Sequence, residues 1–498
     1  MGREEQIVNE RMKKVLELMD KNISPYAYRY DQKDFSEEIK KRFLKLKNNQ
    51  RSKEKGRIAG RIMAIRDIGK LIFATVQDSQ GRIQIILQRE ETEKNSFELF
   101  KKYIDSGDFV GCEGIIMKTK TGEISVLVKK LELLSKSILP LPEKWHGIQD
   151  KEERYRKRYL DLTINPEVKK VFIMRTQILG AIRDFMKENR FVEIETPLLQ
   201  ACYGGACAKP FMTHCDAFDS NLFLSIAPEL YLKKALVGGF ERVYEITKKF
   251  RNEGVDRQHN PEHMTIEWYQ AYADYEDGMN LFENLIKAIS KKLFGILTFE
   301  YQGNKIDLRK WKKISLSDAI KKYLHEDITK IKDDEEAKKI AKKHGVNPEN
   351  ITRANLPDEL MKLFREKLIQ PTFLIDYPAE LAPLAKPKRG DSTKAEVFQP
   401  FIGGMELARA YSELNDPALQ GKNFLEQEQE RKKGNCEAMP TDKDFVTALE
   451  HGMPPACGVG IGIERLTMLF TNQSSIRDVI LFPFMKPETK EEETEEKK

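Results

Sequence analysis

The sequence predicts an α+β chain in which a small all-β barrel precedes a larger body of mixed helices and strands. Two observations predict it. Between residues 57 and 134, apolar and polar side chains alternate with a period of two, in five short segments separated by turns. After Pro140 and Pro142 the pattern changes to a long amphipathic helix at residues 171–189, followed by further strand-like segments. A chain of 498 residues has room for both parts.

The N-terminal part is expected to bind nucleic acid. Residues 1–55 read as a basic, helical N-terminal extension, and residues 56–138 as five strands with one helix at 92–104. That order is what an OB-fold gives, and its strand face suits single-stranded nucleic acid where an aromatic ring and polar groups lie together. Arg66, Phe73 and Gln84 are the candidate contacts.

The remaining boundaries follow from composition. We expect a linker at 139–160, a catalytic body at 161–487 and a disordered, charged tail at 488–498. Within the body, Pro197 cannot donate to a central ladder, so its segment belongs at a sheet edge or a subunit seam. Residues from about 314 to 370 predict a helical surface insertion without a readable motif.

Composition indicates a soluble, cytoplasmic protein. Charged residues make up 33%, no apolar run is long enough to span a membrane, and no secretory signal is visible. The six cysteines are irregularly spaced, as in reduced proteins. Cys202, Cys207, His214 and Cys215 lack the paired spacing of a structural zinc site, so zinc is not expected. A net charge of +6 permits a polyanionic partner.

Arg251 and Glu253 form the most informative pair. They follow an alternating, strand-like segment at 242–246 and are two positions apart, which predicts that both project from one strand face. A guanidinium fork suits phosphate, and a carboxylate accepts hydrogen bonds, so the pair suits a nucleotide. An isolated pair of this kind is usually a solvated surface pair; here His259 and Asn260 follow closely.

Three further clusters accompany this pair. Glu229 begins a predicted helix, and charged and aromatic side chains recur within residues 405–414. A glycine-rich segment at 458–462 leads to Arg465 and an apolar helix. No Rossmann pattern surrounds these glycines, so they more reasonably allow a ligand to approach the backbone.

In this order the clusters resemble the three signature motifs of the class II aminoacyl-tRNA synthetases, at residues 171–197, 250–262 and 458–465. The closer details, including Gly204-Gly205-Ala206, Tyr377-Pro378-Ala379-Glu380 and Ser412-Glu413-Leu414-Asn415-Asp416, resemble the lysyl-tRNA synthetases of bacterial type. The resemblance implies an antiparallel sheet flanked by helices, an anticodon-binding barrel and a homodimer. It also implies activation of lysine by ATP with Mg²⁺, and transfer of lysyl to tRNA(Lys).

The resemblance also implies residue roles. Arg251 and Arg465 would be catalytic, holding the α-phosphate and the γ-phosphate end. The nucleotide site would comprise Arg251, Asn252, Glu253, His259, Asn260, His263, Glu406, Leu407, Gly462 and Arg465. The lysine site would comprise Gly205, Glu229, Glu267, Tyr269, Arg409, Tyr411 and Glu413, and the metal site Glu406 and Gln399.

Three residues depart from the family pattern. Arg409 replaces a usual Asn, Gln399 a usual metal-binding Glu, and His263 the aromatic residue that stacks on adenine. Two like charges about 4 Å apart repel by roughly 4 kcal/mol at an intermediate dielectric. We therefore expect Arg409 to face the carboxylate of lysine and not its ε-ammonium.

Alternatives stay open at this point. An aspartyl- or asparaginyl-type synthetase shares the barrel and fold, but Glu267 and Glu413 disfavour an acidic substrate. A lysine ligase acting on a translation factor would lack the barrel. A catalytically impaired tRNA-binding paralogue would explain the substitutions at Gln399 and Arg409.

Overall fold

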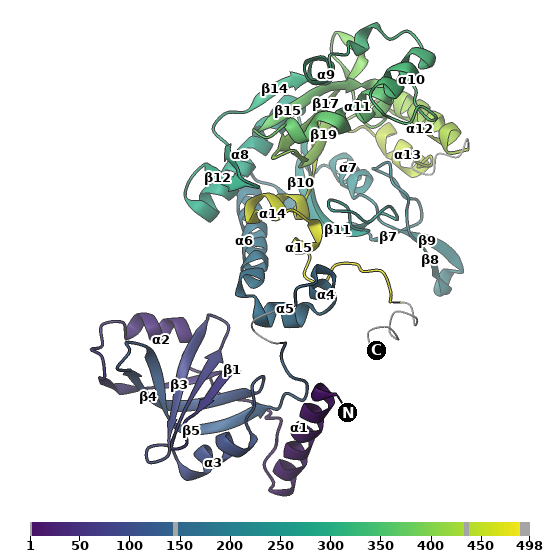
Figure 1. Cartoon of the computed structure of the whole chain (residues 1–498). Helices are drawn as coiled ribbons and strands as arrows, with labels where there is room; N and C mark the ends of the chain where they lie inside the picture. The colour runs from purple at the N-terminus through teal and green to yellow at the C-terminus, as the bar shows by residue number, and fades with distance from the viewer. Residues whose placement is uncertain (1, 143–147, 433–437, 489–498) are drawn as a thin grey trace. The chain divides into compact units, whose positions relative to one another are not determined.

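The computed structural model describes residues 2–142, 148–432 and 438–488. The chain forms two compact units, Met1–Gln149 and Asp150–Lys498 (Figure 1). No helix among the described residues is both long and apolar enough to cross a bilayer. The tail expected at 488–498 lies outside the described residues beyond Glu488.

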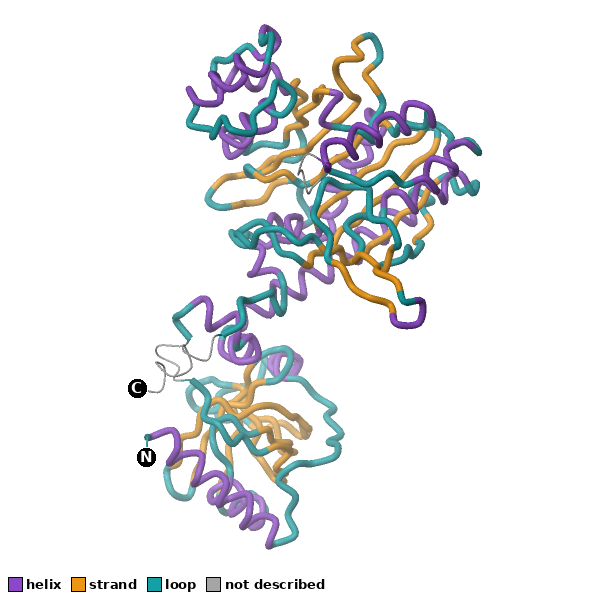
Figure 2. Tube along the Cα trace, turned by 90° about the vertical axis from the view of Figure 1, so that its right-hand side faces the viewer, coloured by secondary structure: helices purple, strands orange, loops and turns teal. Residues whose placement is uncertain are grey.

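The first unit is a closed five-stranded barrel with strand order β1-β2-β3-β5-β4, and Figure 2 shows α1 running beside its strands. The predicted OB-fold is confirmed. Buried and partly exposed side chains alternate along β2, and the buried ones fill the barrel. The elements are α1 (Arg3–Asp20), α2 (Ser36–Arg42), β1 (Arg51–Asp67), β2 (Leu71–Gln77), β3 (Arg82–Gln88), α3 (Lys94–Tyr103), β4 (Phe109–Lys118) and β5 (Ile124–Ser135).

The helical prediction for residues 1–55 is only partly right. Only α1 and α2 are helical there, and β1 already begins at Arg51. Arg11 of α1 is 8% exposed and donates to the carbonyls of Ser106, Ser137 and Leu139. This buried side chain therefore fixes α1 to the segments that precede β4 and follow β5.

The second unit is built on a ten-stranded sheet, ordered β14-β15-β17-β19-β20-β11-β10-β6 with β16 and β18 paired to β17. Its centre is antiparallel, as predicted, while the pairs at both edges are parallel. Pro197 follows edge strand β6, as its missing N–H requires. The strands are β6 (Val192–Glu193), β10 (Arg242–Phe250), β11 (Glu262–Ala271), β14 (Lys312–Ser315), β15 (Thr372–Pro378), β16 (Pro387–Lys388), β17 (Asp391–Ile402), β18 (Met405–Glu406), β19 (Ala408–Ser412) and β20 (Ala456–Gly462).

Helices cover both faces of this sheet. One face packs against α6 (Pro166–Glu188), α8 (Tyr275–Phe294) and α14 (Ile463–Thr471). On the other face lie α7 (Glu229–Val237), α12 (Pro417–Lys432) and α13 (Lys443–Glu450). These layers leave a hollow on the second face, above the centre of the sheet.

The predicted insertion forms α9 (Leu316–Leu324), α10 (Asp334–Lys343) and α11 (Leu356–Phe364), between β14 and β15. Its apolar side chains form a core with the outer part of the sheet. Helices α4 (Lys151–Arg156) and α5 (Arg158–Ile164) occupy much of the segment expected as a linker. A smaller three-stranded sheet contains β7 (Leu199–Gln200), β8 (Met212–Cys215) and β9 (Ser220–Leu224), and a hairpin contains β12 (Thr298–Tyr301) and β13 (Asn304–Asp307).

Candidate active site

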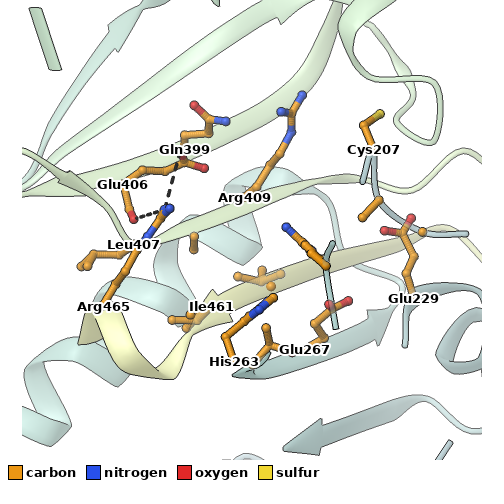
Figure 3. Close-up of a pocket in the computed structure, with 18 of the residues that line it drawn as sticks. Cys207, Glu229, His263, Glu267, Gln399, Glu406, Leu407, Arg409, Ile461 and Arg465 are labelled. Carbon is orange, nitrogen blue, oxygen red and sulfur yellow. Dashed lines mark hydrogen bonds and ion pairs between the residues drawn. The ribbon is translucent and has the colours of Figure 1, made fainter. Parts of the chain in front are cut away.

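A pocket of about 740 Å³ opens on the sheet face opposite α6 and α8 (Figure 3). Its walls follow from the alternation of side chains along the strands, which face the core and the pocket in turn. Ile266 and Trp268 of β11 face the helix-covered core, so Glu267 and Tyr269 face the pocket. In β19, Ala408 and Ala410 are core residues, which leaves Arg409 and Tyr411 facing the pocket.

Glycines form the floor between these strands. Gly458, Gly460 and Gly462 of β20 alternate with core residues and line the pocket. A Cβ added to Gly458 would overlap the Glu413 carboxylate and the Tyr269 ring. The glycine-rich segment therefore makes room for side chains from the neighbouring strands, as well as for a ligand.

One end of the pocket is acidic and rigid. Lys233 Nζ lies 2.6 Å from Oε1 of Glu229, and it also forms an ion pair with Glu413. Tyr411 donates its hydroxyl to Oε2 of Glu229 at 2.6 Å. Lys233 and Glu413 are fully buried and do not line the pocket, whereas Glu229 does. Glu413, expected to contact lysine, thus lies behind the pocket wall.

Glu267 carries the second carboxylate that reaches the pocket. Burial, followed by repulsion from Glu229, raises the pKa of Glu267 to about 8. Tyr269 donates its hydroxyl to Oε2 of Glu267 at 3.4 Å. A ligand ammonium beside this carboxyl group would favour its ionised form.

The other end of the pocket is basic. Arg465 donates to the carbonyl of Glu406 at 2.9 Å and lies 3.2 Å from Nε2 of His259. Burial and the nearby guanidinium groups of Arg365 and Arg251 lower the pKa of Arg465. Cations gathered in this way at a pocket wall favour an anion between them.

The prediction that Arg251 and Glu253 share a strand face is wrong. Strand β10 ends at Phe250, and both residues lie in the loop before β11. Both still line the pocket. Asn252, between them, lies outside the pocket lining and donates its N–H to the carbonyl of Lys209. The loop, and not strand alternation, therefore brings both side chains to the pocket.

His259, Asn260 and His263 line the same end. Burial, together with the charges of Arg251 and Arg465, lowers the pKa of His263 to about 3, so its ring is neutral. Asn260 Oδ1 and Thr265 Oγ1 are buried without a hydrogen-bond partner. Buried polar atoms without partners are costly, and at a pocket wall they suit a bound ligand.

The remaining residues expected at the site also line the pocket. Leu407 and Gly462 line the basic end, and Gly205 lines the acidic end. Gly205 has φ +83°, and a Cβ there would lie 2.7 Å from Cβ of Glu229. Only glycine therefore allows this loop to approach Glu229 so closely.

The Arg409 side chain points away from the acidic end of the pocket (Figure 3). Its guanidinium donates to the carbonyl of Leu381 at 2.8 Å and extends away from Glu229 and Glu267 (Figure 3). Although desolvation opposes it, attraction to Glu406 and Asp358 raises the pKa of Arg409. The side chain consequently belongs to the basic end of the pocket.

The donors available to Mg²⁺ are few. Glu406 faces the pocket, whereas Oε1 of Gln399 accepts a hydrogen bond from the Tyr377 hydroxyl. Within the described residues, no group of three or more His, Cys, Asp or Glu side chains is placed to hold a metal. One carboxylate is compatible with Mg²⁺ that is bound mainly by substrate phosphates.

Sequence reasoning missed several pocket residues. Asp358 and Lys362 of α11, and Arg365 directly after it, line the pocket although the insertion was expected to be a surface feature. No local pattern in the insertion signals this, because its approach depends on the packing of the whole sheet. For Lys233, the spacing of four from Glu229 on a helix was an available signal.

A second, separate surface lies on the barrel of the first unit. Arg66 pairs with Phe73 across β1 and β2, and Gln84 of β3 lies diagonally from Phe73 on the same outward face. Gln84 donates to Oε2 of Glu123 at 2.7 Å. Single-strand nucleic-acid binding proteins use surfaces of this composition, in which an aromatic ring lies beside polar and cationic groups.

Each unit of the chain matches a known protein family. A family described as class II tRNA synthetases (D, K and N) matches residues 150–486, and an OB-fold nucleic acid binding domain matches residues 57–134. Lysine–tRNA ligase of Pelotomaculum thermopropionicum is 48% identical over 98% of this chain and 96% of its own length. Lysine–tRNA ligases of Fervidobacterium nodosum and Thermotoga maritima are 48% and 46% identical, over 96% and 98% of this chain and 94% and 97% of their own lengths.

Proposed function

Since this chain belongs to the lysine–tRNA ligases of the class II tRNA synthetase family, we propose that it joins L-lysine to the 3′ end of tRNA(Lys) at the expense of ATP. The observation that carries the proposal is the polarity of one pocket. Glu229 and Glu267 mark an acidic end, and Arg251 and Arg465 a basic end. Such a pocket suits a cationic amino acid beside a polyphosphate.

In the first step, a carboxylate oxygen of lysine attacks the α-phosphorus of ATP. The bond from that phosphorus to the bridging oxygen breaks, which yields lysyl-adenylate and pyrophosphate. Arg251 holds the α-phosphate and the lysine carboxylate together, and Arg465 holds the γ-phosphate end. Catalysis is then positioning and charge stabilisation, without a side-chain nucleophile.

In the second step, a hydroxyl of the terminal ribose of tRNA attacks the lysyl carbonyl and AMP leaves. His263, as a neutral ring, stacks on adenine, while Asn260 and His259 surround the nucleotide. Glu406 would hold Mg²⁺ together with the ATP phosphates, and the ion would supply further positive charge there. Gln399 contributes little to that ion because its oxygen is hydrogen bonded to Tyr377.

Lysine is recognised at the acidic end. Glu229 and Gly205 receive the α-amino group, while Glu267 and Tyr269 receive the ε-ammonium. Glu413 contributes indirectly to lysine recognition. Its ion pair with Lys233 holds that ammonium beside Glu229 and so keeps Glu229 in place. Two carboxylates at the pocket wall disfavour aspartate and asparagine as substrates.

Further parts of the proposal concern partners and surroundings. The barrel binds the anticodon through Arg66, Phe73 and Gln84. A homodimer is supported by apolar residues on the edge of the sheet unit, Ile173 and Val192, which are 51% and 47% exposed. A cytoplasmic location is supported by five free thiols among the described residues; Cys436 lies outside them.

The test is ATP–pyrophosphate exchange with each of the twenty amino acids in turn. We expect exchange with lysine alone. Exchange with aspartate or asparagine would show that this amino acid, and not lysine, is the substrate. If no amino acid supports exchange but the protein still binds tRNA(Lys), the result would support a tRNA-binding paralogue. Attachment of lysine to a protein and not to tRNA would support the translation-factor ligase.

A further inference from the structure

Arg409 extends toward the basic end of the pocket (Figure 3). Its guanidinium donates to the carbonyl of Leu381 at 2.8 Å and lies 5.9 Å from the centre of the Tyr377 ring. The carboxylates that attract it are those of Glu406 and Asp358. Neither Glu229 nor Glu267, the carboxylates of the acidic end, is among them.

Sheet register explains this separation. Arg409 and Glu267 both pair with Gly460, so one complete strand lies between them. Two strand spacings amount to roughly 10 Å. On the other side, Phe398 pairs with Ala410, and continuing the same antiparallel register places Gln399 opposite Arg409. Arg409 is therefore a cross-strand neighbour of Gln399 and a distant neighbour of the lysine-recognising carboxylate.

Gln399 is poorly placed to recruit a cation. It is 2% exposed, it is uncharged, and its oxygen already accepts the hydrogen bond of Tyr377. The same Tyr377 side chain presents its ring to Arg409. Tyr377 thus contacts both the neutral amide of Gln399 and the guanidinium of Arg409, which lie side by side next to Glu406.

We propose that Arg409 binds the pyrophosphate that leaves the nucleotide, and that it does not bind lysine. A carboxylate at position 399 would recruit a divalent cation to this place. Because Gln399 is uncharged, the Arg409 guanidinium supplies the positive charge instead. Arg465 and Arg365 extend the same basic wall. A guanidinium fork matches phosphate oxygens and keeps its charge without a metal. The inference rests on the proposed function, since it assigns the pyrophosphate leaving group to this wall.

The test measures binding of inorganic pyrophosphate to the full-length protein by calorimetry in EDTA. Arg409→Gln is expected to weaken pyrophosphate binding about 10- to 100-fold, the loss of one or two charge-assisted hydrogen bonds. Arg409→Lys should weaken it less. Lysine binding to both variants should change less than about twofold. Arg309→Gln, an exposed arginine paired with Asp307, is the control and should leave both affinities unchanged.

A second variant tests the replacement of a metal by an arginine. Gln399→Glu in the Arg409→Gln background should recover pyrophosphate binding only when Mn²⁺ is added, with the bound Mn²⁺ followed by electron paramagnetic resonance. Recovery without Mn²⁺, or no recovery with it, would contradict the replacement.

The remaining outcomes are equally decisive. Weakened lysine binding with unchanged pyrophosphate binding would show that Arg409 faces the amino-acid carboxylate. If Arg409→Gln does not fold, unchanged pyrophosphate affinity in Arg409→Lys together with weakened lysine binding overturns the inference. Lysine-dependent exchange by the unmodified protein tests the proposed function separately, so either conclusion can fail alone.

Discussion

Lys233, behind the pocket wall, forms an ion pair with Glu229, which lines the pocket; Nζ and Oε1 are 2.6 Å apart and the ammonium is fully buried. Glu413 contacts the same ammonium. One lysine of the protein therefore neutralises part of an acidic cluster whose remaining charge is available to a lysine ligand. The consequence is that this site depends on an internal cation for both its stability and its shape.

Replacing this internal cation should be severely destabilising. Lys233→Met leaves Glu229 and Glu413 buried without their counterion, which costs about 3–5 kcal/mol in the free energy of unfolding. Lys234→Met is the matched control, because Lys234 pairs with the exposed Asp444 and should cost about 0–1 kcal/mol. Urea unfolding followed by tryptophan fluorescence measures both. Equal losses in the two variants would disprove a special role for the buried pair.

Lysine binding should strengthen as the pH rises from 6 to 8. The pKa of Glu267 is raised, chiefly by burial, to about 8, so below that pH the free protein holds a proton that the ligand ammonium must displace. The gain is at most about tenfold per pH unit. Calorimetry in two buffers of different ionisation enthalpy should show proton release at pH 7. Glu267→Gln should bind lysine weakly and without this pH dependence.

The same pKa has the opposite effect on the free protein. Because the folded pKa of Glu267 lies above its usual value of about 4.5, folding takes up a proton between pH 4.5 and 8. The contribution of this group to stability is therefore lost as the pH rises through that window. The lysine-induced rise in melting temperature should consequently be larger at pH 8 than at pH 6. An equal rise at both values would contradict the assignment.

His263 should contribute to nucleotide affinity through its neutral ring. His263→Ala removes a stacking surface and should weaken ATP binding by about 0.5–1.5 kcal/mol, whereas His263→Phe should preserve or strengthen it. The depressed pKa of His263, caused mainly by burial, predicts no change in ATP affinity from its titration between pH 5 and 8. Equilibrium dialysis with labelled ATP checks both statements. Unchanged affinity in His263→Ala would place adenine elsewhere.

Phe73 should affect tRNA binding without affecting amino-acid activation. Phe73→Ala removes the ring on the outward face of the barrel, and it should weaken tRNA(Lys) binding by about 1–3 kcal/mol. Tyr28→Ala, which removes a fully exposed ring of the same unit, is the control and should have little effect. Filter binding measures affinity, and lysine-dependent pyrophosphate exchange should be equal in both variants. Reduced exchange in Phe73→Ala would instead indicate a structural role.

The sequence alone determined the features that depend on local order. Period-two alternation predicted the barrel strands, because successive side chains of a strand point to opposite faces. It also placed Glu229 at a helix start and Gly458–Gly462 as the alternating glycines before Arg465. The order of the motifs then supported the resemblance to a known family, and that resemblance implied lysine and ATP as substrates.

Tertiary structure alone decided where those charges point. The loop after Phe250 brings Arg251 and Glu253 to the pocket, and Lys233 holds Glu413 behind the pocket wall. Arg409 lies at the basic end because an entire glycine strand separates it from Glu267, and Arg365 reaches the pocket only through packing of the insertion against the sheet. The physical reason is common to all four. Register and packing join residues far apart in the chain, whereas local periodicity specifies only the face from which each side chain projects.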